Sequence, residues 1–143
     1  MSDPTVLPVV LVVEDEPLVR SVMADALQEE GITVIEAGNA AEALLMLEAR
    51  RDISVVLTDV EMPPGARGSH LAMEVSKRWP TTRTVITSGR TWPQPHEMPD
   101  SAVFLPKPWT SELLVQYVWE AADRAQVARG RWGHQEVGSG QQI

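Results

Sequence analysis

The chain has 143 residues, of which 43% are apolar and 22% are charged, values that are ordinary for one soluble globular domain. Its formal net charge of −8 argues against nucleic acid and anionic membranes as partners, because both attract basic proteins. The sequence has no cysteine and no apolar run long enough to span a bilayer, which excludes disulfides and thiolate chemistry and leads us to expect a cytoplasmic protein.

Strand-like and helix-like patterns alternate along the first part of the chain. The continuous apolar run Val9–Val13 predicts a strand that is covered on both faces. Pro17 suits the first turn of a helix that Gly31 would end. The apolar face expected for this helix consists of Leu18, Val22, Met23, Ala26 and Leu27. A second strand is expected over Thr33–Ala37.

The same alternation continues to the end of the domain. The elements expected here are a helix capped by Asn39, a strand over Ile53–Asp59, a helix ended by Pro80, strands over 83–89 and 101–106, and a helix from Ser111 to about Arg129. Between the last two strands lie Pro93, Pro95 and Pro99. A proline in a helix interior costs about 3 kcal/mol. We therefore expect a loop or a single turn there, with the fourth helix shortened or absent.

Strand–helix alternation predicts an α/β fold, with a doubly wound five-stranded parallel sheet and helices on both faces. We expect an N-terminal lead at 1–6, one domain at 7–129 and a flexible C-terminal tail at 130–143. In such folds the ligand site lies beyond the carboxyl ends of the strands.

Charged and hydroxyl side chains follow the ends of the predicted strands. They are Glu14 and Asp15 after the first strand, Asp59 at the third, Ser88 at the fourth and Lys107 at the fifth. Carboxylates that share a site repel one another unless a cation lies between them, and Mg²⁺ prefers such oxygen ligands. Mg²⁺, Lys107 and Ser88 around an ionised Asp59 would favour phosphoryl transfer to an aspartate nucleophile.

Four motifs resemble those of the receiver domains of two-component response regulators. They are "VVEDE", "LTDVEMP", "VITSG" and "LPKPW", in that order and spacing, and the resemblance extends from about Leu7 to Arg129. It implies a flavodoxin-like sheet of strand order 2-1-3-4-5. It also implies a phosphoacceptor that assists its own phosphorylation and dephosphorylation, rather than an enzyme acting on other substrates.

The resemblance implies a role for each of the matching residues. Asp59 would accept the phosphoryl group from a sensor histidine kinase or a histidine phosphotransfer protein. Glu14, Asp15 and Asp59 would hold Mg²⁺ together with the backbone carbonyl of Glu61. The residues expected to act on the phosphoryl group or to switch are Lys107 as its cationic partner, Ser88 as the switch hydroxyl and Phe104 as the switch aromatic. The Lys107–Pro108 peptide bond would be cis.

The sequence also departs from the family pattern. Phe104 replaces the commoner tyrosine, Trp109 stands where phenylalanine is frequent, and no effector domain follows the receiver-like segment. The resemblance therefore implies a single-domain regulator that acts through contacts with an unknown downstream protein. Trp119 lies off the core stripe of the last helix, which makes this helix a candidate homodimer surface unless Trp119 packs against the tail.

Two other functions compete with this interpretation. An aspartyl-nucleophile phosphatase would usually carry a second aspartate two residues after the nucleophile, where this chain has Glu61 and no capping insertion. A flavodoxin-like module that binds flavin would need a hydroxyl- and glycine-rich loop after the first strand. This chain has the acidic sequence "EDEP" there, which repels phosphate.

Overall fold

The computed structural model describes residues 7–60, 68–89 and 93–138. Five parallel strands form one sheet: β1 Val9–Val13, β2 Thr33–Ala37, β3 Ile53–Asp59, β4 Arg83–Ser88 and β5 Ala102–Pro106. Their order across the sheet is β2-β1-β3-β4-β5, which confirms the predicted flavodoxin-like topology. The strand order reverses at β1, so β1 and β3 lie side by side at the centre of the sheet.

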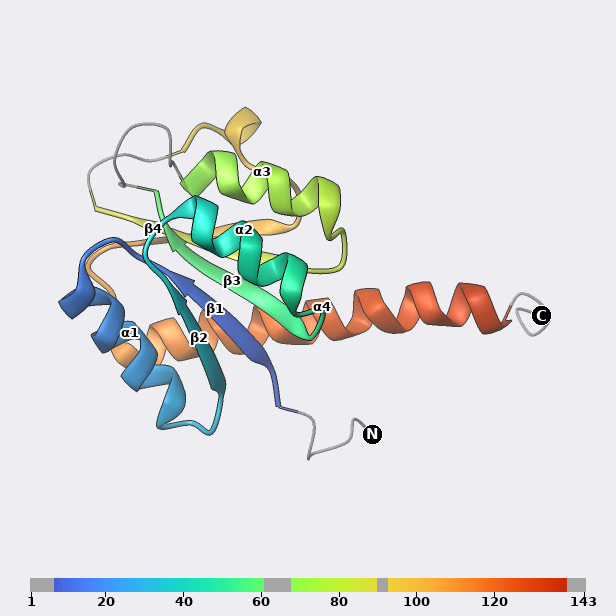
Figure 1. Ribbon diagram of the computed structural model, residues 1–143, viewed down its shortest axis with the longest axis horizontal. Helices are drawn as coiled ribbons and strands as arrows, with labels where there is room; N and C mark the ends of the chain where they lie inside the picture. Colours follow the sequence, from blue (N-terminus) through green and yellow to red (C-terminus); the bar gives the residue numbers. More distant parts are fainter. Residues whose placement is uncertain (1–6, 61–67, 90–92, 139–143) are drawn as a thin grey trace.

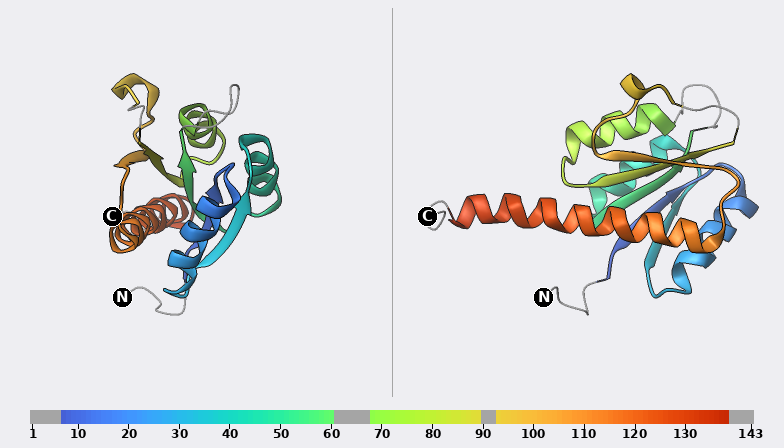
Figure 2. Two further views of the ribbon diagram at one scale, coloured as in Figure 1. Left: turned by 90° about the vertical axis from the view of Figure 1, so that its left-hand side faces the viewer. Right: turned by 180° about the vertical axis from the view of Figure 1, so that it is seen from behind.

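Helices cover both faces of this sheet. They are α1 Pro17–Gln28, α2 Ala40–Ala49, α3 Gly68–Arg78 and α4 Ser111–Gly138. α1 and α4 lie on one face, and α2 and α3 lie on the other (Figures 1 and 2). Of the helices in the described ranges, none has both the length and the apolar character needed to cross a bilayer.

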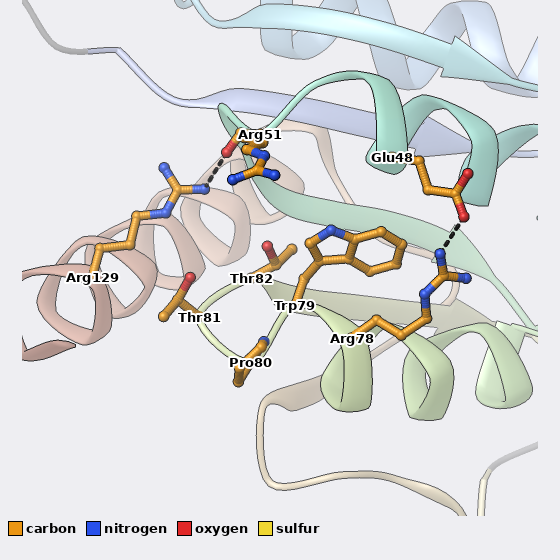
Figure 3. A pocket seen from close by; sticks show the side chains of 8 residues that line it. All are labelled: Glu48, Arg51, Arg78, Trp79, Pro80, Thr81, Thr82 and Arg129. Atoms are coloured by element: carbon orange, nitrogen blue, oxygen red, sulfur yellow. Dashed lines mark hydrogen bonds and ion pairs between the residues drawn. The ribbon is translucent and has the colours of Figure 1, made fainter. Parts of the chain in front are cut away.

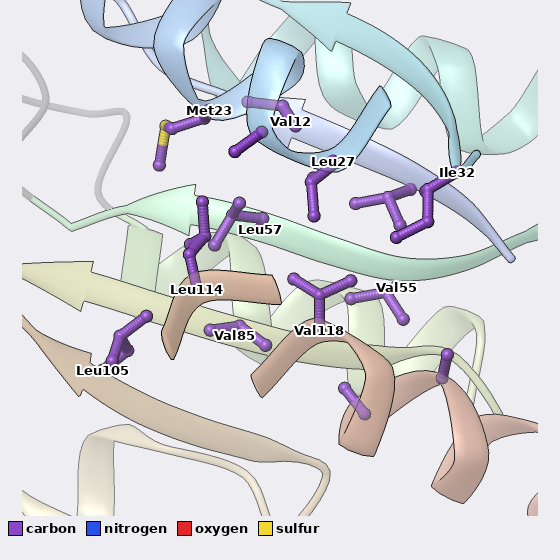
Figure 4. Packing of buried hydrophobic residues seen from close by; sticks show 14 residues of the cluster. Val12, Met23, Leu27, Ile32, Val55, Leu57, Val85, Leu105, Leu114 and Val118 are labelled. Atoms are coloured by element: carbon purple, nitrogen blue, oxygen red, sulfur yellow. The ribbon is translucent and has the colours of Figure 1, made fainter. Parts of the chain in front are cut away.

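The larger core cluster lies between the sheet and the pair α1 and α4 (Figure 4). Its members on the strands include Val12, Val55 and Leu57, and these meet Leu27 from α1 and Leu114 from α4. All of these side chains are fully buried, and burial of one such side chain stabilises the fold by about 1.5–3 kcal/mol. β3 is buried at every position, which explains its continuous apolar sequence.

α1 buries a narrower stripe than its sequence predicts. Met23, Ala26 and Leu27 are buried as expected, but Leu18 is 81% exposed and Val22 is 54% exposed. The prediction that these two side chains point inward is wrong. Leu18 and Val22 lie four residues apart on a side of α1 that the sheet and α4 leave uncovered, whereas Met23, Ala26 and Leu27 belong to the core cluster.

The connection between β4 and β5 contains one short turn, the 3₁₀ helix η1 at Pro95–Glu97. Gln94 precedes it, and the Gln94 N–H donates to Glu97 Oε1 at 2.8 Å. The predicted loss of a full fourth helix is confirmed, because the structure has only this single turn in the described part of the connection. Residues 90–92 of the connection, including Trp92, lie outside the described residues.

α4 differs from its prediction at its C-terminal end. The helix was expected to end near Arg129, but it continues to Gly138, and its C-terminal part projects past the sheet (Figure 1). The predicted helix end near Arg129 is therefore wrong, whereas the flexible tail expected at 130–143 stays a prediction, and 139–143 lie outside the described residues. Gly130 lies inside the helix, where a glycine costs only about 1 kcal/mol.

Trp119 on α4 is half-buried rather than exposed. Its ring packs against the core cluster on the α1 and α4 face. With Leu7 and Pro8 it lines a pocket of about 360 Å³ beside the start of β1. The expectation of an exposed tryptophan on the last helix is therefore wrong, and the homodimer surface on this helix stays a prediction.

Candidate functional site

The predicted site residues meet at the carboxyl edge of the sheet. Asp59 is the last residue of β3 and is only 3% exposed. Glu14 directly follows β1, its neighbour in the sheet, and Ser88 ends β4 on the other side. Lys107 follows β5, whose Pro106 is in register with Ser88. The parallel sheet therefore brings together residues that are up to 93 positions apart in the chain (from 14 to 107).

Asp59 and Lys107 form an ion pair at the mouth of β3. Lys107 Nζ donates to Asp59 Oδ2 at 2.7 Å. The side chain of Asp59 is 5% exposed and that of Lys107 is 29% exposed, so water screens the pair weakly. A charge-assisted hydrogen bond of this kind is shorter and stronger than one between neutral groups, and it places the ammonium charge directly at Asp59 Oδ2.

The backbone around Lys107 fixes the position of its ammonium group. The Lys107–Pro108 peptide bond is cis, as the resemblance implied. The Lys107 N–H donates to the Ser88 carbonyl at 2.9 Å, which extends the pairing of β4 and β5 by one residue. The lysine side chain therefore starts from a defined point and is directed back toward Asp59.

Glu14 is a buried carboxyl group, 2% exposed, whose two oxygens differ. Oε2 accepts a hydrogen bond from the Glu16 N–H at 3.0 Å. Oε1 is buried and receives no hydrogen bond from any described residue. Burial is the main cause that raises the pKa of Glu14 to about 8. The Glu16 N–H lowers this pKa, while neighbouring Asp59 and Asp15 raise it.

This arrangement fits a divalent cation. A buried carboxylate oxygen without a donor, beside a second carboxylate, is the kind of oxygen ligand that Mg²⁺ takes. Asp15 is exposed beside Glu14, and Glu61 lies outside the described residues. In the described ranges no three acidic or histidine side chains are placed to hold an ion by themselves. Backbone and phosphoryl oxygens and water would therefore complete the shell, as is usual for Mg²⁺.

The two predicted switch residues occupy different surroundings. Ser88 is fully buried at the end of β4. Phe104 on β5 is half-buried, lies in register with Ile86 of β4 and packs against a small cluster with Val60 and Ala72. The same cluster contacts Met98, which follows η1. Phe104 and Met98 thus pack against the same cluster, which links β5 to the η1 connection.

Trp109 makes a contact near the site that sequence reasoning missed. Its indole Nε1 donates to the Thr87 Oγ1 at 3.0 Å, and Thr87 is fully buried on β4, next to Ser88. The indole ring packs against the core cluster. A buried indole N–H needs an acceptor, and this requirement was the available signal. Sequence alone gives no means of choosing Thr87 among the buried threonines.

Arg20 on α1 was also missed. Its Nη1 donates to the Glu14 backbone carbonyl at 2.7 Å, and its Nε donates to Glu36 Oε1 at 3.1 Å. Arg20 therefore fixes the backbone that carries the buried carboxyl group. An arginine in the first turns of a helix is common, and no signal in the sequence separates this one from a solvated side chain.

Comparison with known proteins is consistent with this geometry. The family model described as the response regulator receiver domain matches residues 10–119. The sensor kinase CckA of Brucella abortus is 36% identical over 119 residues, which cover 80% of this chain and 12% of that protein. The hydrogenase transcriptional regulatory protein HoxA of Cupriavidus necator is 30% identical over 119 residues, covering 80% of this chain and 24% of HoxA. The chain thus spans a quarter or less of the length of these two relatives.

Solved structures give the same result for the fold. The receiver domain of the hybrid histidine kinase CckA is 32% identical, with a TM-score of 0.67, and the match covers 80% of this chain and 98% of that one. A CheY-like response regulator receiver domain protein from Methanospirillum hungatei has a TM-score of 0.74 at 22% identity. The match covers 86% of this chain and 99% of that one. The second match, at this lower identity, bears on the fold alone.

Proposed function

Because the chain belongs to the family of response regulator receiver domains, we propose that Asp59 accepts a phosphoryl group from a histidine kinase or a histidine phosphotransfer protein. The observation that carries this proposal is the buried Asp59–Lys107 ion pair beside the Glu14 carboxyl group. The relative CckA, which is named as a sensor kinase and whose receiver domain is described as that of a hybrid histidine kinase, is consistent with a histidine kinase as the donor.

The transfer step follows from the placement of these groups. An ionised Asp59 oxygen attacks the phosphorus of the phosphohistidine, and a P–O bond forms as the P–N bond breaks. The electron pair of the P–N bond returns to the imidazole nitrogen, and Asp59 becomes an acyl phosphate. The Lys107 ammonium, which pairs with Asp59 Oδ2, neutralises negative charge on the phosphoryl oxygens.

Mg²⁺, when bound, supplies further positive charge at the same phosphoryl oxygens. Glu14, Asp15 and Asp59 would hold the ion, with the Glu61 carbonyl as a fourth protein ligand. The Ser88 hydroxyl would bond to a phosphoryl oxygen and move toward it. Phe104 would then rotate into the space that Ser88 leaves and carry the signal to a downstream protein. Water attacking the phosphorus would release phosphate and restore Asp59.

Treatment with acetyl phosphate and Mg²⁺ tests the proposal directly. Intact-mass and peptide mass spectrometry should find one added phosphoryl group, located on Asp59. Asp59→Asn should gain none and remain folded, since asparagine keeps the size of the side chain and removes a charge beside Glu14, whose pKa Asp59 raises. Asp25→Asn, a matched change at an exposed position on α1, should be phosphorylated like the unchanged protein. A phosphoryl group elsewhere, or one that persists in Asp59→Asn, would contradict the assignment.

A further inference from the structure

A pocket of about 540 Å³ opens at the end of the sheet opposite Asp59 (Figure 3). Its lining comes from the end of α2, the connection before β3, the end of α3, the connection before β4, and α4. The residues used below are Glu48, Arg51, Arg78, Trp79, Thr81 and Arg129, and we call this site the arginine pocket. Its volume is in the range of sites that bind small molecules.

The arginine pocket concentrates positive charge in an acidic protein. Three of the 12 lysines and arginines line it, although the chain as a whole has a net charge of −8. Arg78 forms an ion pair with Glu48, which neutralises both charges. Arg51 and Arg129 then leave a net positive charge in the pocket, and a cationic, concave surface of this kind attracts anions.

The two remaining guanidinium groups are placed to bind a ligand. Arg129 Nη2 donates to the carbonyls of Arg51 and Ile53, at 3.2 and 2.9 Å, which holds the group in place and leaves its other donors for a ligand. No acceptor in the described part of the chain binds the Arg51 guanidinium. In the view of Figure 3 both groups lie on one side of the pocket, and the Trp79 ring lies on the other.

Trp79 gives the pocket a flat aromatic wall. The ring is half-buried, and the Arg78 Cζ lies over it at 4.5 Å from the ring centroid. The ion pair with Glu48 holds Arg78 in that position. Part of the ring surface packs against the core cluster of the α2 and α3 face, and another part lines the pocket, where a planar group is able to stack.

We propose that the arginine pocket binds an organic phosphate that carries a planar ring, of the size of a mononucleotide. Arg51, Arg129 and the Thr81 hydroxyl donate to the phosphate, and the ring stacks against Trp79. Guanidinium groups bind phosphate with two donors at once, and aromatic side chains accept any nucleobase. The pocket lies at the opposite end of β3 from Asp59, about 20 Å away along the strand, so it is separate from the phosphoacceptor.

The test uses the full chain and adenosine 5′-monophosphate, with neither Mg²⁺ nor acetyl phosphate present. Titration calorimetry and amide and indole NMR spectra should show sub-millimolar binding, with the shifts centred on Trp79 and Arg51. Arg51→Gln should weaken binding about tenfold or more, because a charge-assisted hydrogen bond is lost. Arg51 is exposed and its side chain has no partner in the described ranges, so this variant should keep the spectrum of the folded protein.

Arg124→Gln serves as the matched control. It removes the same charge from an exposed position of α4 outside the pocket, and it should leave the affinity unchanged. Ribose 5-phosphate, which lacks the ring, and adenosine, which lacks the phosphate, should each bind at least about tenfold more weakly. The proposal is wrong if adenosine 5′-monophosphate does not bind at millimolar concentration, or if Arg51→Gln binds it as tightly as the unchanged protein does. It is also wrong if ribose 5-phosphate or adenosine binds as tightly as adenosine 5′-monophosphate. Asp59 chemistry is not involved, so these outcomes are independent of the proposed phosphotransfer.

Discussion

At position 14 the protein encloses a carboxyl group almost completely and leaves one oxygen without a donor among the described residues. Burial, with a contribution from Asp59 and Asp15, raises the pKa of Glu14 from 4.5 to about 8. Between these two values the folded protein holds a proton on Glu14 that the unfolded chain has lost. Linkage then requires the free energy of unfolding to fall as the pH rises from about 4.5 through about 8. Glu14 is thus a destabilising residue in the absence of a cation.

Glu14→Gln should remove this pH dependence. In EDTA at pH 8 we expect the variant to be more stable than the unchanged protein by about 1 kcal/mol or more, since each pKa unit corresponds to about 1.4 kcal/mol. At pH 4.5 the two should be similar, because the native Glu14 is then protonated. Urea unfolding at the two pH values measures both differences. Glu30→Gln, at an exposed position, is the control and should have the same stability as the unchanged protein at both pH values. If Glu14→Gln raised the free energy of unfolding equally at both pH values, the shifted pKa of Glu14 would be contradicted.

Mg²⁺ should reverse the effect of the buried carboxylates. A ligand that binds only the folded state stabilises it by RT ln(1 + [L]/Kd), about 1.4 kcal/mol at ten times Kd. We expect millimolar Mg²⁺ to raise the urea midpoint of the unchanged protein. The increase should be smaller in Glu14→Ala and smallest in Asp15→Ala, because Asp15 is the residue that matches the direct metal ligand in the family pattern. Asp25→Asn should respond fully. An equal Mg²⁺ response in all four proteins would exclude the metal site.

The contact between Trp109 and Thr87 should contribute to stability through its hydrogen bond. Trp109→Phe leaves the Thr87 hydroxyl without its indole donor and should cost about 1 kcal/mol or more. Thr87→Val removes the acceptor while keeping the shape of the side chain. A double-mutant cycle in urea isolates the coupling, for which we expect about 0.5–1.5 kcal/mol. A coupling of zero would mean that Trp109 acts only through packing.

Among the secondary-structure elements, the β4–β5 connection differs most from a regular strand–helix alternation. Prolines confine its helical part to the single turn η1, and its described side chains from Gln94 to Met98 are exposed or half-buried. Met98 nevertheless packs in the cluster that holds Phe104. A segment with few buried contacts opens at low free-energy cost. A displacement of Phe104 would therefore change the order of this segment more readily than it would shift a packed helix.

Hydrogen exchange over this connection tests the switch. With a phosphoryl analogue and Mg²⁺ bound, we expect the amides from Gln94 to Ala102 to exchange more slowly than in the free protein. The amides of α2 are the internal control, because α2 packs over β1 and β2, toward the opposite edge of the sheet from β5, and should not change. Asp59→Asn treated in the same way should show no difference. Equal protection in both states would place the output on another surface.

For the protein as a whole, the sequence predicts what depends on local pattern and on sheet topology. Continuous apolar runs located the strands, and the ends of parallel strands brought Asp59 and Lys107 together without any knowledge of their contact. Periodicity failed at Leu18 and Val22, because it does not say which of two adjacent stripes the neighbouring elements cover. The arginine pocket was not predicted for a similar reason, since its residues are far apart in the chain and meet only in the folded protein.

The position of Arg129 also has a mechanical consequence. Its hydrogen bonds to the carbonyls of Arg51 and Ile53 attach α4 to the start of the central strand β3 and to the connection before it. Beyond Arg129 the helix continues for nine further residues, 130–138, or about 13 Å at 1.5 Å per residue. A rotation of α4 about this attachment point would therefore displace Gly138 further than the helical residues that pack on the sheet.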